Sequence, residues 1–97
     1  MLNILVFLGM FFQIRVYTSI KTYKLKGEVI YESDQVQRVR VTGKNGSIVL
    51  QNNRPFLLSK GLKSKRVHWS LKEGQINNVY FLSRLIEELD RYFMLDR

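Results

Sequence analysis

The chain contains the sequence VQRVRVTGKNGSIVLQ at residues 36–51, in which two runs rich in β-branched residues flank an Asn-Gly pair. Asn-Gly between such runs is a strong signal for a β-hairpin, because both residues tolerate the positive φ of a type I′ turn. In the first run arginines alternate with valines, at Arg38, Val39, Arg40 and Val41. This alternation predicts an apolar inner face and a basic outer face.

Further strands are predicted on both sides of this hairpin. Strands are predicted at residues 14–26, 28–32, 56–58 and 66–72, from β-branched and aromatic residues or from the alternation of apolar and polar residues. The alternation places Tyr23, Val29, Tyr31, Val67, Trp69 and Leu71 on the inner face. Gly27 is predicted to separate the first two strands.

A helix is predicted at the C-terminal end, over residues 77–95. Asn77 or Asn78 can serve as its N-cap, and no Gly or Pro follows. Apolar residues recur there at helical spacing, at Val79, Leu82, Ile86, Leu89 and Phe93, with Leu85 and Tyr92 widening the stripe. The expected fold is therefore α+β: an antiparallel meander or small barrel of five to seven strands, closed by an amphipathic helix.

Length and composition favour one domain over residues 1–97, with a β region at 14–72 before the helix. Residues 1–12, MLNILVFLGMFF, are apolar apart from Asn3 and Gly9, but a span needs roughly 20 residues to cross a bilayer. The stretch is a buried strand, a leader or an anchor. The expected location is cytoplasmic, and this apolar start leaves export or membrane association as alternatives.

The residue types present argue against an enzyme. The chain has no cysteine, which excludes disulfides, thiolate metal sites and thiol nucleophiles. Its one histidine, His68, leaves no His-rich metal site. Glu87, Glu88 and Asp90 are interleaved with arginines and are predicted to lie on the solvated side of the helix. We expect no catalytic residue, no metal and no cofactor.

Charge is the main indication of function. The formal net charge is +8, and such a surface attracts phosphates and other polyanions. The candidate phosphate-binding residues are Lys24, Lys26, Arg38, Arg40, Lys63, Lys65, Arg66, His68 and Lys72. The resulting hypothesis is a non-enzymatic module that binds nucleic acid mainly through phosphate contacts.

Aromatic residues refine this hypothesis. Tyr17 is the ring predicted to be exposed, whereas Trp69 is predicted in the core, so contacts to the phosphate backbone are favoured over base stacking. The alternative is a membrane-surface or protein-interaction domain that uses the apolar N-terminus with the basic face. Surplus apolar residues in the helix also leave room for a homodimer.

Overall fold

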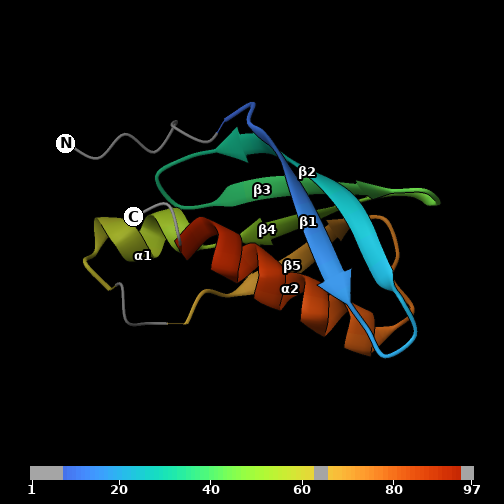
Figure 1. Ribbon diagram of the computed structural model, residues 1–97. Coiled ribbons are helices and arrows are strands. Elements are labelled where there is room, and N and C mark those ends of the chain that lie inside the picture. Colours follow the sequence, from blue (N-terminus) through green and yellow to red (C-terminus); the bar gives the residue numbers. More distant parts are fainter. Residues whose placement is uncertain (1–7, 63–65, 95–97) are drawn as a thin grey trace.

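In the computed structural model, which describes residues 8–62 and 66–94, five antiparallel strands form one sheet in chain order (Figure 1). The elements are β1 (Phe11–Tyr17), β2 (Thr22–Glu32), β3 (Gln37–Gly43), β4 (Gly46–Asn52), α1 (Arg54–Ser59), β5 (Trp69–Glu73) and α2 (Val79–Met94). The predicted α+β meander with a C-terminal helix is confirmed. The sheet is not closed into a barrel, because β1 and β5 are its two edges.

The apolar N-terminal stretch enters the sheet at its end. Its first seven residues lie outside the described part of the chain, Leu8 and Gly9 form a turn, and β1 begins at Phe11. Within the stretch predicted as one strand, residues 18–21 instead form a turn. The Thr18 hydroxyl donates to the Lys21 carbonyl at 2.9 Å and accepts from the Lys21 N–H at 3.2 Å. A threonine side chain can thus close a turn without Gly or Pro.

Strand β2 continues through Gly27, which was predicted to end a strand. Phe12 lies opposite Gly27 in the β1–β2 register, and a Cβ on Gly27 would come within 2.4 Å of the Phe12 ring. The glycine therefore makes room for an aromatic side chain. Beyond it, the β2–β3 register shifts between Val29 and Tyr31.

This β-bulge corrects the prediction for the end of β2. An extra residue in one strand reverses the side-chain parity that follows it. Tyr31, predicted on the inner face, is exposed, whereas Glu32 is buried.

The central hairpin is confirmed, but its turn is not of type I′. Gly43 pairs with Gly46, which makes Lys44 and Asn45 the two turn residues. A type I′ turn needs positive φ at both of these positions, and within the described residues no non-glycine has a positive φ. The conformational demand falls instead on Gly46, whose φ is 133°.

Residues 56–58, predicted as a strand, belong to the short helix α1. Pro55 lies in its first turn, where a missing amide donor costs no intrahelical hydrogen bond. Three apolar residues are too few to show a helical or a strand period.

Strand β5 is shorter than the predicted strand over residues 66–72. Trp69 and Leu71 pair with the buried Asn52 and Leu50, as inner-face residues should. However, Trp69 is only half-buried and Leu71 is exposed, since an edge strand has a neighbour on one side only.

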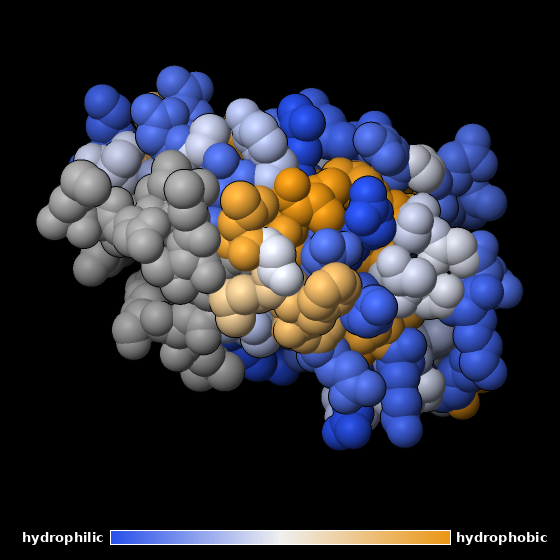
Figure 2. All heavy atoms as spheres, turned by 90° about the horizontal axis from the view of Figure 1, so that it is seen from above, coloured by the Kyte–Doolittle hydropathy of each residue, from blue (hydrophilic) through white to orange (hydrophobic). Residues whose placement is uncertain are grey.

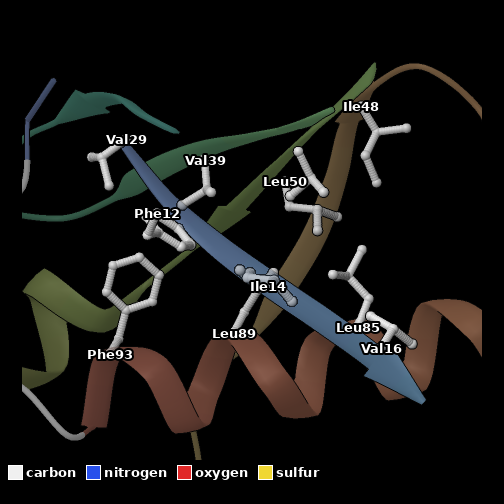
Figure 3. Packing of buried hydrophobic residues seen from close by; sticks show 11 residues of the cluster. Phe12, Ile14, Val16, Val29, Val39, Ile48, Leu50, Leu85, Leu89 and Phe93 are labelled. Carbon is white, nitrogen blue, oxygen red and sulfur yellow. The ribbon is translucent and has the colours of Figure 1, made fainter. Parts of the chain in front are cut away.

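Helix α2 covers the inner face of the sheet. Asn78 is its N-cap, because the Asn78 Oδ1 accepts the Phe81 N–H at 3.0 Å. The residues of α2 that are almost completely buried are Leu85, Leu89 and Phe93, and they meet the inward side chains of the curled sheet (Figure 3). Val79, predicted on the apolar stripe, is exposed; it lies in the first turn at the margin of that stripe.

The C-terminal end of α2 is tied to α1 by a buried polar chain. Glu32 Oε2 accepts a hydrogen bond from Gln37 Nε2 at 2.8 Å, and Gln37 Oε1 accepts one from Asn52 Nδ2 at 2.9 Å. Asn52 Oδ1 in turn accepts the Arg54 N–H, and Arg54 Nη2 donates to the Phe93 carbonyl, both at 2.9 Å. A cation is favourable near the terminal carbonyls of a helix, so Arg54 fixes the orientation of α2 on the sheet.

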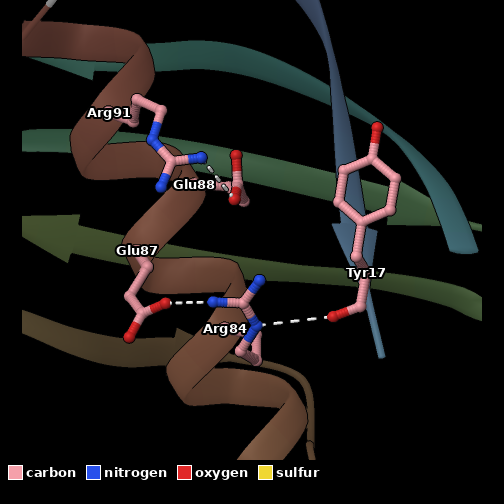
Figure 4. Close-up of polar contacts among 5 residues, drawn as sticks. All are labelled: Tyr17, Arg84, Glu87, Glu88 and Arg91. Carbon is pink, nitrogen blue, oxygen red and sulfur yellow. Dashed lines mark hydrogen bonds and ion pairs between the residues drawn. The ribbon is translucent and has the colours of Figure 1, made fainter. Parts of the chain in front are cut away.

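Helix α2 also lies against the edge strand β1 (Figure 4). Arg84 Nε donates to the Tyr17 carbonyl at 3.4 Å and also pairs with Glu87. One turn later, Glu88 pairs with Arg91 at 2.9 Å. Contacts of this kind cover backbone groups that an edge strand would otherwise offer to another chain.

Candidate functional site

Four of the predicted site residues lie together on the outer side of the sheet. Lys24 and Lys26 are on β2, Arg38 and Arg40 are on the neighbouring β3, and all four are exposed. Arg15 of β1 lies opposite Lys24 and extends the group to a third strand. We call Arg15, Lys24, Lys26, Arg38 and Arg40 the outer basic face.

Exposed aromatic rings stand beside these cations. The Lys26 ammonium lies 4.9 Å from the centre of the Phe11 ring, and the Arg38 guanidinium lies 5.1 Å from that of Tyr31. Tyr17, at the end of β1, is exposed as predicted. The sequence did not predict that Phe11 and Tyr31 are exposed. Phe11 lies at the end of an apolar run whose structure was ambiguous, and no sequence pattern indicates the bulge that turns Tyr31 outward.

Hydrogen bonds orient the two arginines. Arg38 Nε donates to Gln51 Oε1 at 2.8 Å, which holds the guanidinium between this amide and the Tyr31 ring. Arg40 Nη1 pairs with Glu28 Oε1 at 3.4 Å, and both side chains are partly solvated. Among the described residues, the ion pairs include neither lysine of this face, so both ammonium groups remain available to an anion.

The other predicted site residues lie elsewhere or outside the described part. Lys63 and Lys65 fall in the range 63–65, which the structure does not describe. His68 is exposed, and its backbone N–H donates to Asn53 Oδ1 at 2.8 Å. Lys72 is exposed on β5, which β3 and β4 separate from β2.

Arg66 precedes β5 and acts on a carboxyl group of α2. Asp90, predicted on the solvated side of the helix, instead accepts the Trp69 indole N–H at 2.7 Å. Burial raises the pKa of Asp90, and the Trp69 hydrogen bond and the charge of Arg66 partly oppose that rise. Arg66 therefore lies near enough to α2 for its charge to act on Asp90, and it is not on β2 or β3 with Lys24, Lys26, Arg38 and Arg40.

Apolar side chains border the outer basic face at the start of β1. Leu8, Met10 and Phe11 are exposed, and the backbone of Gly9 and Met10 bonds to Val29 of β2. Seen from above, the molecule shows hydrophobic side chains gathered among hydrophilic ones (Figure 2). The outer side thus combines cations with exposed rings, and further exposed apolar side chains lie next to it at the start of β1.

The described residues hold no group of three His, Asp or Glu side chains that could bind a metal ion. In the same part of the chain, no helix is both long and apolar enough to cross a membrane. No family model, curated protein or solved structure matches this chain.

Proposed function

We propose that this protein is a non-enzymatic module that binds single-stranded nucleic acid on the outer side of β1, β2 and β3. The observation that carries the proposal is the pairing of cations with exposed rings on adjacent strands, Lys26 with Phe11 and Arg38 with Tyr31. Cations bind the phosphate backbone, and exposed rings stack on bases. Because duplex bases already stack on one another, the rings favour an unpaired strand.

A salt titration on a labelled single-stranded oligonucleotide tests the phosphate contacts. One variant replaces Lys24, Lys26, Arg38 and Arg40 by Gln. Each lost contact should reduce the slope of log affinity against log salt by about 0.7, so we expect the slope to flatten by roughly two to three units. Folding should change little, since exposed ion pairs contribute about 0–1 kcal/mol.

The matched control replaces four cations elsewhere, Lys44, Lys60, Arg66 and Lys72, by Gln. It has the same net charge as the first variant, so a general charge effect would flatten both slopes equally. We expect the control to keep most of the parent slope. Absence of binding by the parent at low salt, or equal flattening in both variants, would show that the outer basic face is ordinary surface.

Stacking is tested separately by the double change Phe11→Ala and Tyr31→Ala. Both side chains are exposed, so little folding energy should be lost. Each stacked base contributes about 1–3 kcal/mol, so loss of both rings should lower affinity at least about thirtyfold while the salt slope stays unchanged. If the double variant changes the salt slope but binds the oligonucleotide as tightly as the parent at low salt, the rings only position Lys26 and Arg38.

A membrane surface is the second candidate, and the exposed Leu8, Met10 and Phe11 favour it. Apolar side chains beside cations suit an interface with anionic lipid. Vesicles of phosphatidylglycerol are the parallel ligand, with the double variant Leu8→Ser and Met10→Ser. Loss of vesicle binding in this variant, with oligonucleotide binding retained, would assign the apolar area to lipid.

A further inference from the structure

A cavity opens between the inner face of the sheet and the beginning of α2, at the end of the sheet where β2 begins. Its volume is about 670 Å³, within the range of about 300–1,000 Å³ that is usual for small-molecule sites. It lies beside the turn of the β3–β4 hairpin and the start of β2, and residues 75, 76 and 78 border it before α2 begins. Its apolar walls are formed by Leu25, Val41, Ile48, Ile76, Phe81 and Leu85.

The cavity exists because packing against α2 is incomplete at this end. Leu85 is fully buried, but Leu25, Ile76 and Phe81 are only partly buried although they pack against the core. In the first turn of α2, Val79 and Tyr80 are exposed. Apolar walls that remain accessible to solvent favour an apolar occupant.

The charge around the cavity is positive. Three exposed lysines border it: Lys21 from the β1–β2 turn, Lys24 of β2 and Lys44 from the β3–β4 turn. Of the described residues that line it, none is acidic. Cations at the rim of an apolar cavity attract an anionic group and leave the interior to a hydrocarbon.

Lys21 is held at the wall by its neighbours. Its ammonium lies 4.7 Å from the centre of the Tyr23 ring, and the Tyr23 ring packs edge-on against Phe81 at 5.0 Å. A cation over an aromatic face is attracted by the ring quadrupole, so the charge stays beside the apolar walls.

We propose that this cavity binds a small amphiphile that has an apolar chain and a single anionic head, such as a medium-chain carboxylate. The chain occupies the space between Ile48, Ile76 and Phe81, and the head lies at the rim beside Lys21 and Lys44. The site shares Lys24 with the outer basic face, but the apolar walls and the other two lysines, Lys21 and Lys44, lie outside that face. The proposal therefore does not depend on nucleic-acid binding.

Decanoate, decanol and butanoate are the probes, each titrated into the full chain and followed by backbone amide NMR. We expect saturable shifts for decanoate around Tyr23, Ile76 and Phe81, weaker binding of decanol, and no saturation with butanoate. Absence of saturation with decanoate, or shifts centred on the outer basic face, would overturn the proposal without any variant.

Two variants then separate the head from the chain. The double variant Lys21→Gln and Lys44→Gln should weaken decanoate binding by about fivefold or more and leave decanol binding unchanged. The matched control, Lys60→Gln with Lys72→Gln, should leave the binding of both ligands unchanged. Ile76→Trp should fill the cavity and weaken both ligands. Unchanged decanoate binding in a folded Ile76→Trp protein would contradict the site. If that variant does not fold, the positions of the NMR shifts in the parent decide whether decanoate binds in the cavity.

The source of the amphiphile is distinguished with phosphatidylglycerol vesicles. If decanoate releases the protein from them, an acyl chain of a lipid also enters the cavity. If the protein binds decanoate but not vesicles, the ligand is a free amphiphile. Vesicle binding without decanoate binding would reject the cavity as the site.

Discussion

At the C-terminal end of α2, Phe93 packs edge-on against Phe12 with ring centres 5.5 Å apart, and Tyr92 stacks on Phe12 at 4.1 Å. At its N-terminal end, Phe81 and Leu85 border a cavity of about 670 Å³. One helix on one sheet thus has a packed end and an open end. We define the packed end by Phe12, Gly27, Leu89, Asp90, Tyr92 and Phe93, and the open end by Tyr23, Gly46, Ile76, Phe81 and Leu85.

The contacts that stabilise the fold and the space for a ligand therefore lie at opposite ends of α2. Dense aromatic packing and the buried polar chain concentrate stabilising contacts at one end of the helix. The other end can leave apolar walls uncovered because the first end already holds the helix in place. Local opening is therefore expected at the start of α2 before its C-terminal half.

The largest effect is expected from two leucines one turn apart on α2. Leu85 and Leu89 are both fully buried, but of these two residues Leu85 borders the cavity. Leu89→Ala should cost about 4 kcal/mol, because it leaves a new void in dense packing. Leu85→Ala should cost about 2–3 kcal/mol, because the space it leaves joins an existing opening. Urea denaturation measures both, and equal costs would mean that the two ends are equally packed.

The next comparison uses two glycines. Gly27→Ala would bring a Cβ within 2.4 Å of the Phe12 ring, which Tyr92 and Phe93 hold from the other side. Overpacking of this kind costs about 1–3 kcal/mol, and we expect the upper part of that range.

Gly46→Ala meets no atom within 4 Å, but its φ of +133° is strained for any other residue. We expect a cost of about 1 kcal/mol from the backbone alone, and a larger cost for Gly46→Val because its side chain is β-branched. Thermal denaturation of the parent and the Ala variants checks the order. A larger loss at Gly46 than at Gly27 would show that the hairpin turn, not the aromatic contact, limits stability.

Much of this fold could be predicted where a pattern persists over several residues. The alternation around Val39 and Val41 determines which side of β3 faces the core, and the apolar recurrence through Leu89 and Phe93 identifies α2. Both patterns are long enough to define a period, and the Asn-Gly pair marks the hairpin even though the turn is of another type.

The candidate site was predictable only in part. The outward lysines and arginines of β2 and β3 follow from alternation, but the outward turn of Tyr31 depends on a bulge that inserts one residue against β3. The effect of the Arg66 charge on the Asp90 pKa could not be predicted, because the two residues are far apart in the sequence. The cavity results from incomplete packing between elements far apart in the chain, which no local pattern contains.

The smallest effect concerns Asp90, the carboxyl group whose neighbours Trp69 and Arg66 attach β5 to the packed end of α2. Its folded-state pKa is raised from the usual 3.8, mainly because burial disfavours the charged form. The folded state therefore binds the proton more tightly than the unfolded chain. The stability that this group contributes is fully present below pH 3.8 and is lost as pH rises through the raised pKa.

Asp90→Asn removes the charge and keeps an oxygen that can accept the Trp69 N–H. Parent and variant should be equally stable near pH 3, where the parent carboxyl is protonated, and the variant should be the more stable one at pH 7. The gain should be smaller than the ~1 kcal/mol of a typical hydrogen bond, because Arg66 attracts the charge that is removed. Urea denaturation at both pH values measures it, with Asp34→Asn on an exposed turn as the matched control. The opposite result would be a variant that loses stability relative to the parent as pH rises. It would mean that the attraction of Arg66 and the hydrogen bond from Trp69 stabilise the Asp90 carboxylate more than burial destabilises it.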